Sequence, residues 1–409
     1  MMLLSLTLFA VAAALPATTK QKGQVLKCFV ETEEQANTYA KLEVDTWTHH
    51  VSVGKNLQVL VKNEQEKSAV EKIFGTCSVE IPDVSSYIEE TRDWMNLDDS
   101  ASSRVVADDT EFFKAYQKYE AIISKLQSWA SSNPELVTYS VIGKSVEGRD
   151  IPVLKMTNSN VSDSSKKAIF FNAGIHAREW LAYSTNLYLI SKLLSESGTN
   201  PTVQSWLKTT QNPDGYSWTY NPGGYRFWRK NRRVNRDGSI GVDLNRNFDE
   251  HWGQFGTSSS PSSDVYHGTS PFSEPETRSV SDFILSIPNK IAGIDIHTMD
   301  QSILRSWGWT KTNSKNENIL KKLGDGMAAE IKNNSGFVYR SEKSASLLAS
   351  GCEDDWMTAK ALINGWTLEL RGPSFNVPPS NIVPAGEEIF AAITYFINFN
   401  LNNVIPPNV

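Results

Sequence analysis

Apolar and polar residues alternate on two different scales along the chain. In the first hundred or so residues the apolar runs are short, polar turns separate them, and helical periodicity lasts only a few turns at a time. This pattern predicts a small unit of strands and helices. The predicted strands are residues 24–30, 51–53, 57–61 and 78–81, and the predicted helices are residues 34–42 and 66–74.

A polar segment, residues 96–104, ends this first pattern and is typical of an exposed linker. After it, apolar strands alternate with longer helices. Residues 168–175 form a continuous apolar run, as expected for a strand that is buried on both faces. The alternation predicts an α/β sheet that is covered by helices on both sides. Further strands are predicted over 136–142, 151–157, 291–296 and 366–370, and helices over 112–130, 178–194 and 386–398.

The composition is that of a globular protein, because 40% of the 409 residues are hydrophobic and 21% are charged. The 40 basic residues and 46 acidic residues give a net charge of −6, so no basic excess points to a nucleic-acid partner. Beyond the N-terminus the sequence contains no apolar run of the length that a membrane span needs, which argues against a membrane protein.

The first residues are typical of an export signal. Residues 1–14 are apolar and end in small side chains that form an A-x-A pattern. We therefore expect a signal peptide over residues 1–15 and a secreted protein. In a secreted chain Cys28 and Cys77 could form a disulfide and leave Cys352 free. The alternative is three buried thiols, and the sequence does not decide between the two.

Residues that can bind a metal follow two of the predicted buried strands. His176 and Glu179 come directly after the strand at 168–175 and can point to one site. Taken alone, this spacing is more often found on a surface helix. His297 follows the strand at 291–296 and supplies a third ligand. Two imidazoles and a carboxylate suit zinc, with the fourth position open to water.

Further chemistry is indicated by charged residues in apolar or amide-rich surroundings. Glu369 lies in the strand at 366–370, where a carboxylate is costly to bury unless it has a partner or a function. Beside a metal it could act as a general base, and a structural ion pair with Arg371 is the alternative. Arg229 and Arg246 stand among aromatic and amide residues, where an arginine can hold a carboxylate through two hydrogen bonds.

These clusters together resemble the zinc metallocarboxypeptidases of the pancreatic digestive type, the procarboxypeptidase A/B family. The resemblance spans nearly the whole chain and is carried, in the family's order, by FNAGIHAREW, NPDGY, FWRKNRR, GVDLNRN, SEPET, ASGCEDDW and TLELRG. It implies an α/β catalytic domain over residues 105–409, with an eight-stranded mixed sheet between helices. It also implies that residues 16–104 are a small antiparallel α+β activation prosegment, which blocks the active site until a trypsin-like protease cleaves at Arg104.

The resemblance also implies roles for single residues. His176, Glu179 and His297 match the ligands of one zinc ion. Glu369 matches the general base for the water that zinc activates, and Arg229 matches the group that polarises the scissile carbonyl. The other matches are Asn245 and Arg246, which hold the C-terminal carboxylate of the substrate, Arg178 in an outer subsite, and Asp243, a carboxylate behind His176.

The chain departs from the family at substrate-binding positions. Leu347 stands where the family has a mobile tyrosine that caps the bound carboxylate, and Met299 replaces a tyrosine in a subsite wall. Asp354 matches the floor of the specificity pocket, where an acid is typical of the branch that removes C-terminal Lys or Arg. The alternative for Asp354 is that it only favours the start of a helix.

The sequence therefore predicts a secreted, monomeric zymogen that removes C-terminal residues from peptides and proteins, with a preference for Lys or Arg. Three alternatives stay open. The same enzyme could prefer aromatic or aliphatic residues, the chain could be a zinc-binding pseudoenzyme, or it could be a zinc deacylase that acts on acylated amino acids.

Overall fold

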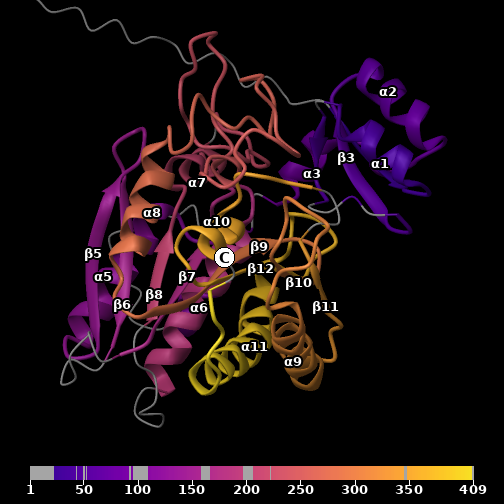
Figure 1. Ribbon diagram of the computed structural model, residues 1–409. Helices are drawn as coiled ribbons and strands as arrows, with labels where there is room; N and C mark the ends of the chain where they lie inside the picture. Colours follow the sequence, from indigo (N-terminus) through magenta and orange to yellow (C-terminus); the bar gives the residue numbers. More distant parts are fainter. Residues whose placement is uncertain are drawn as a thin grey trace, which may run out of the picture.

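The computed structural model describes residues 23–42, 44–48, 51, 53–91, 94, 109–157, 166–196, 206–221, 223–344 and 348–407. The signal peptide predicted at 1–15, the cleavage site predicted at Arg104, and Leu347 lie outside these residues. Within them the chain forms a small N-terminal unit and a larger main domain, which are seen side by side in Figure 1.

The N-terminal unit is an antiparallel sheet with the strand order β2-β3-β1-β4 and helices between the strands. Its elements are β1 (Gln24–Phe29), α1 (Glu33–Tyr39), β2 (Asp45–Thr46), β3 (Asn56–Val61), α2 (Glu64–Phe74), β4 (Ser78–Ile81) and α3 (Val84–Glu89). The strand predicted over 51–53 is wrong. Val53 and Gly54 lie in a turn, and the φ of 80° at Gly54 belongs to the left-handed region, which a strand does not use.

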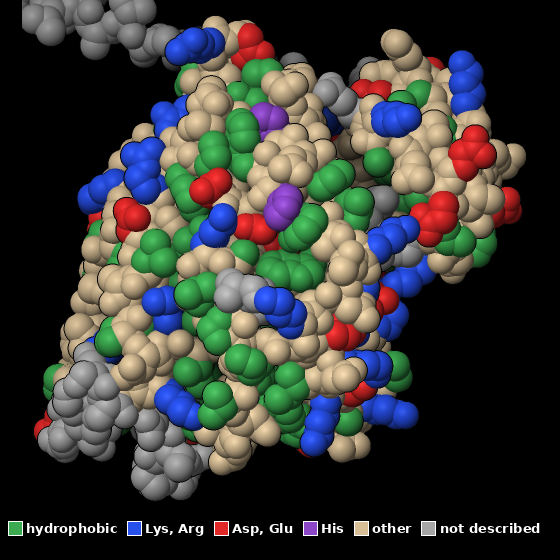
Figure 2. Space-filling model, in the orientation of Figure 1, with side chains coloured by type: hydrophobic (Ala, Val, Ile, Leu, Met, Phe, Trp, Pro, Cys, Tyr) green, Lys and Arg blue, Asp and Glu red, His purple; other side chains and the backbone are tan. Residues whose placement is uncertain are grey.

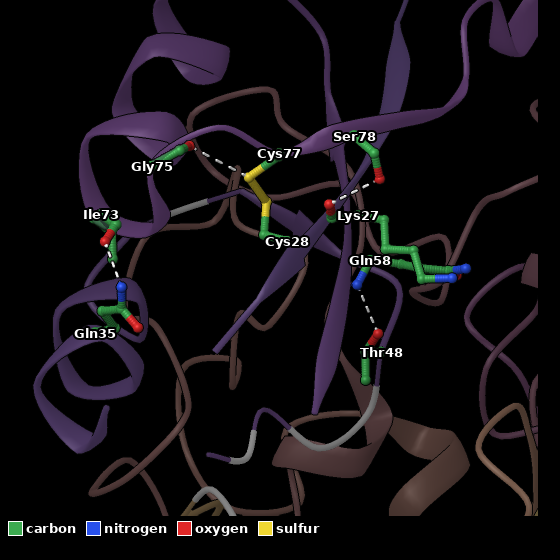
Figure 3. Close-up of a disulfide and its surroundings, with 9 residues drawn as sticks. All are labelled: Lys27, Cys28, Gln35, Thr48, Gln58, Ile73, Gly75, Cys77 and Ser78. Carbon is green, nitrogen blue, oxygen red and sulfur yellow. Dashed lines mark hydrogen bonds between the residues drawn. A yellow bond between two sulfur atoms is a disulfide. The ribbon is translucent and has the colours of Figure 1, made fainter. Parts of the chain in front are cut away.

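A disulfide closes the N-terminal unit on itself. Cys28 on β1 and Cys77, just before β4, form the bond, as Figure 3 shows. Cys352, in the main domain, is a buried free thiol. Of the two cysteine arrangements that the sequence left open, the paired one is therefore present.

Strands β1 and β3 have buried apolar side chains on both faces of the small sheet, because neighbouring residues of a strand point to opposite faces. Leu26 and Val59 belong to the unit's own core together with residues of α1 and α2. Val25 and Leu60, their neighbours in the sequence, belong to a second cluster that includes Phe227 of the main domain. The second face of the N-terminal sheet thus packs against the main domain.

The main domain is built on an eight-stranded mixed sheet with the strand order β11-β10-β12-β9-β7-β8-β6-β5, which confirms the predicted mixed α/β sheet. Strands β12, β9, β7 and β8 run parallel at its centre, and antiparallel pairs lie on either side of them. The strands are β5 (Val137–Lys144), β6 (Asp150–Met156), β7 (Ala168–Ala173), β8 (Trp206–Thr210), β9 (Lys290–Thr298), β10 (Ser302–Arg305), β11 (Arg340–Lys343) and β12 (Asn364–Leu370).

Helices cover both faces of this sheet, as Figure 1 shows. Phe171 and Ile294 point to one face and pack with α5 (Tyr119–Ser132), α6 (Trp180–Glu196), α9 (Glu317–Ser335) and α11 (Ile382–Asn402). Phe170 points to the other face and packs with α8 (Pro275–Ser286) and α10 (Glu353–Ala359). The remaining α-helices of the described chain are α4 (Asp109–Phe112) and α7 (Pro213–Tyr220).

The helix predicted over 112–130 is confirmed in its later part, which is α5, but α4 ends at Phe112 and residues 113–118 are not helical. Lys118, directly before α5, has a ψ of 155°, which is an extended conformation that ends helical hydrogen bonding. No helix of the described residues is both long and apolar enough to cross a membrane. On the face shown in Figure 2, basic and acidic side chains are interspersed.

Candidate metal centre and substrate pocket

Parallel strands bring the candidate site together at one edge of the main sheet. His176 follows β7, His297 lies near the end of β9, and Glu369 of β12 is paired with His297 in the sheet register. Glu179 directly precedes α6, which begins at Trp180. The carboxyl ends of parallel strands lie at the same edge of a sheet, and this edge is where α/β sheets bind their ligands.

His176, Glu179 and His297 form a buried group whose ligand atoms all lie within 4.8 Å of one another. The Nδ1 atom of His176 lies 2.8 Å from Oε1 of Glu179, and Nδ1 of His297 lies 3.0 Å from Oε2. Burial by itself would raise the pKa of Glu179, but the two imidazoles hold this pKa well below its usual value. Two nitrogens and an ionised carboxylate, each fully buried, are a donor set that fits zinc.

Each histidine also contacts a carboxylate through its other ring nitrogen. Nε2 of His176 lies 3.1 Å from Oδ1 of Asp243, and Nε2 of His297 lies 2.7 Å from Oδ2 of Asp295. The contact of Asp243 agrees with the sequence prediction. The sequence analysis missed Asp295. Its signal is the spacing of two residues in a strand, which puts Asp295 and His297 on the same face.

Arg229 contacts the metal-binding group and also lines the neighbouring cavity. Its Nε and Nη2 donate to Oδ2 of Asp243 at 3.1 and 2.9 Å, and its Nη1 lies 3.4 Å from Nδ1 of His176. The guanidinium is therefore fixed by Asp243 within reach of a group bound at the histidines. Arg371, the alternative partner of Glu369, instead lies 3.6 Å from Glu388.

A cavity of 420 Å³ holds most of the other predicted site residues. It is lined by Arg229, Asn245, Arg246, Asp354 and Glu369, among others. Asn245 is fixed through its Oδ1, which accepts from the backbone N–H of Glu353 at 2.9 Å. Arg246 is held through Nε, which donates to the carbonyl of Gly256 at 2.8 Å. The cavity is thus lined by cationic and amide groups that are held by hydrogen bonds and also by buried carboxylates.

Asp354 and Asp355 have different surroundings although they are adjacent. Asp355 accepts from the backbone N–H groups of Gly308 and Trp309 at 2.8 to 3.1 Å, so it supports that loop. Asp354 lines the cavity and accepts from Ser344 Oγ at 3.1 Å. Of the acids at the start of α10, Asp354 is the one that a ligand in the cavity would meet.

Two predicted substrate-binding residues contact the N-terminal unit. Nη1 of Arg178 donates to Oδ1 of Asp45 at 2.7 Å, and Nη2 donates to the carbonyl of Thr46 at 3.0 Å. Met299 is buried in the same apolar cluster as Trp47. Sequence patterns could not show these contacts, because they join residues more than a hundred positions apart in two separate units.

Comparisons with known proteins agree with this geometry. The family model described as zinc carboxypeptidase matches residues 122–392. Carboxypeptidase A2 of Rattus norvegicus is 32% identical over 392 residues, which cover 90% of this chain and 92% of that protein. Carboxypeptidase B of Astacus astacus is 34% identical over 300 residues, which cover 70% of this chain and 97% of that protein.

The fold is also that of a solved carboxypeptidase. The crystal structure of carboxypeptidase A from Helicoverpa armigera superposes with a TM-score of 0.83 at 28% identity, covering 94% of this chain and 99% of that one. The family match extends over more than half of the chain and includes the histidine and glutamate residues of the metal-binding group. The chain therefore belongs to the zinc carboxypeptidase family and is a metallocarboxypeptidase, a hydrolase with one zinc site.

Proposed function

We propose that this chain is the secreted zymogen of a carboxypeptidase that removes C-terminal Lys or Arg from peptides and proteins. One observation carries the proposal. Glu369, the pair Asn245 and Arg246, and Asp354 line the same 420 Å³ cavity. A C-terminal Lys or Arg presents a scissile bond, a carboxylate and a cationic side chain, and the cavity offers a partner of suitable charge for each.

The roles of the chain's own residues follow from their placement. When bound, zinc supplies a Lewis acid that activates water and polarises a carbonyl. Glu369, which is fully buried in β12, accepts the proton of the attacking water and returns it to the leaving amine. Arg229 stabilises the negative charge that develops on the carbonyl oxygen. Asn245 and Arg246 bind the free carboxylate, which restricts the reaction to the last peptide bond.

The preference for a basic side chain is attributed to Asp354. This residue is 5% exposed and lines the cavity, so a substrate side chain there is removed from water. A buried carboxylate attracts a cation and disfavours an apolar side chain that would leave it without a counter-charge. An acid in this position does not support the alternative, which is a preference for aromatic or aliphatic side chains.

The N-terminal unit is proposed to be the activation prosegment. Its residues Tyr39, Thr46 and Thr48 line the same cavity as the catalytic candidates, so a long substrate would collide with them. Astacus carboxypeptidase B matches this chain over 97% of its own length but over only 70% of this chain. Release by a trypsin-like protease at Arg104 would uncover the cavity.

The proposal is tested by treating the full chain with trypsin and measuring hydrolysis of peptides that end in Arg, Lys, Phe or Leu. We expect release of Arg and Lys, loss of this release with a zinc chelator, and a new N-terminus near residue 105. The variant Asp354→Ile should lose the preference for Lys and Arg and gain hydrolysis of Leu peptides, because the charge of the pocket is replaced by an apolar side chain.

Other outcomes of this experiment would support a different specificity or a different function. Release of Phe or Leu by the unchanged enzyme would contradict the role of Asp354 but keep the peptidase. Hydrolysis of acylated amino acids without peptide hydrolysis would favour a deacylase. If correctly cleaved, zinc-loaded protein released no residue, the chain would be a pseudoenzyme.

A further inference from the structure

We propose that Asp295 is a positioning residue of the zinc site, which holds His297 in the tautomer that leaves Nδ1 available to the metal. The inference rests on the proposed role of His297 as a zinc ligand. It concerns a residue that neither the sequence patterns nor the family resemblance indicated.

The two ring nitrogens of His297 contact different carboxylates. Nε2 lies 2.7 Å from Oδ2 of Asp295, and Nδ1 lies 3.0 Å from Oε2 of Glu179 in the metal-binding group. A carboxylate can only accept a hydrogen bond, so Asp295 requires a proton on Nε2. The neutral ring then has its lone pair on Nδ1, on the side where Glu179 and His176 converge.

Asn245 favours the opposite tautomer of His297. Its Nδ2 lies 3.4 Å from Nε2 of His297, while its Oδ1 is already occupied by the N–H of Glu353. An amide nitrogen donates, so Asn245 favours a bare Nε2 and moves the proton to Nδ1, where it would block the metal. The shorter contact with the carboxylate is the stronger one. Asp295 therefore decides the tautomer against Asn245.

Each proposed zinc histidine contacts one carboxylate, but the two carboxylates differ in their other contacts. Asp243 backs His176 at 3.1 Å and also binds Arg229 in an ion pair of 2.9 Å. In the described part of the chain, the ion-pair partner of Asp295 is His297 alone. Asp295 is 1% exposed, so its contact is not weakened by solvent. We expect the support of His297 to depend on this one residue.

The decisive measurement is the zinc affinity of the full chain, obtained by competition with a chromogenic chelator. Replacing a partner of this kind typically weakens metal binding by about 10- to 100-fold, and we expect a change of this size in Asp295→Asn. The matched control is Glu353→Gln. Oε2 of Glu353 accepts from Nδ2 of Asn172 at 2.8 Å, and an amide oxygen can accept the same hydrogen bond, so this change should leave zinc affinity unchanged.

A second readout reports the tautomer directly. In zinc-loaded protein with 15N-labelled histidine, Nε2 of His297 should carry a proton whose resonance lies downfield because of the short contact with Asp295. Asp295→Asn should move this resonance upfield. The measurement on the unchanged protein does not depend on whether a variant folds.

Four results would overturn the inference, and they differ in what else they affect. Equal zinc affinity of Asp295→Asn and the unchanged chain would remove the role of Asp295 and leave the proposed function intact. An equal loss of affinity in Glu353→Gln would show that the effect is not specific to the carboxylate of Asp295. A bare Nε2 on His297 would exclude the assigned tautomer. Failure of the unchanged chain to bind zinc would overturn the proposed function as well.

Discussion

Glu369 illustrates how much the surroundings of one side chain decide its chemistry. It is fully buried in β12, it lines the cavity, and it is paired in the sheet with His297. A carboxylate in such a place is costly to bury, and the proposed role of Glu369 in proton transfer would account for it. Its neighbour Arg371 lies 3.6 Å from Glu388.

Changing Glu369 to Gln should therefore abolish proton transfer without removing the metal. The amide has nearly the same shape but cannot accept the proton, so kcat should fall by about 100- to 10,000-fold. Zinc content should stay the same, because Glu369 is not part of the metal-binding group. Steady-state kinetics and metal analysis of the activated protein check this. Glu353→Gln, also a buried acid, should keep its kcat. A kcat within tenfold of the unchanged enzyme would contradict the role of Glu369.

At the residue scale, sequence reasoning identified the members of the site that stand at strand ends. His176 and His297 follow apolar runs, and that pattern alone placed them near each other. The spacing of two residues puts Asp295 on the same face of β9 as His297, but this spacing alone does not show that the carboxylate contacts the imidazole. The contact between Arg178 and Asp45 depends on how two units dock, which local patterns do not encode.

At the element scale, the carboxylate of Glu276 at the start of α8 binds two loops that are far apart in the sequence. Oε1 of Glu276 accepts from the backbone N–H of Val146 at 3.0 Å, and Oε2 accepts from Asn231 Nδ2 at 3.2 Å. The side chain is fully buried. This burial raises the pKa of Glu276 from 4.5 to about 7. The charged carboxylate therefore destabilises the fold in which it is buried.

This shift predicts a pH dependence of stability with a definite sign. The folded state binds the Glu276 proton more tightly than the unfolded state, so the free energy of unfolding should fall as pH rises from about 4.5 to about 7. Glu276→Gln lacks this dependence. Between pH 5 and pH 8 its free energy of unfolding, relative to the unchanged protein, should increase by about 2 kcal/mol. Denaturant unfolding at both pH values measures it, and a difference that is independent of pH would contradict it.

The disulfide gives a second prediction at this scale. It closes a loop with a sequence separation of 49 residues within the N-terminal unit, and a loop of that size corresponds to about 4 kcal/mol of stability in the chain-entropy model. The double change of Cys28 and Cys77 to Ser should make this unit sensitive to protease while the main domain stays resistant. Limited proteolysis followed by mass spectrometry checks this. Cys352→Ser is the control, because Cys352 lies in the main domain; equal sensitivity of both variants would refute the prediction.

Sequence patterns were reliable for a strand that is buried on both faces and least reliable for the shortest strands. The apolar run at 168–175 correctly indicated β7, because a strand buried on both faces has no polar positions. The strand predicted over 51–53 failed because the chain turns there at Gly54. Strand β2 has only two residues, too few for an alternating pattern, and it is fixed instead by pairing with β3.

At the scale of the whole molecule, the N-terminal unit is attached to the main domain by contacts of different quality. Asp45 and Arg178 form an ion pair of 2.7 Å whose side chains are 3% and 1% exposed. Beside it, the fully buried Trp47 packs on Phe227 at a ring distance of 4.6 Å. Glu33 and Lys311 form another ion pair between the two parts, at 3.1 Å, but both side chains are more than 60% exposed.

These differences predict which contact keeps the proposed zymogen inactive. Asp45→Asn would leave Arg178 buried without a counter-charge, and breaking a buried pair in this way costs about 3 to 5 kcal/mol, which is about 100-fold or more in the docking equilibrium. The uncleaved variant should therefore hydrolyse peptides much faster than the uncleaved unchanged chain. After trypsin treatment the two should be equally active, because Asp45 then lies on the released segment.

The control is Glu33→Gln, which removes a charge from the same unit at an exposed pair. Such pairs contribute at most about 1 kcal/mol, so the uncleaved Glu33→Gln chain should stay as inactive as the unchanged one. Both variants lose one carboxylate that faces a cation of the main domain, but only the Asp45 pair is buried. A difference between them is therefore an effect of burial and not of the lost charge alone. If uncleaved Asp45→Asn were also inactive, the apolar contacts around Trp47 would be sufficient to hold the unit over the cavity. The buried ion pair would then orient the prosegment without deciding its affinity.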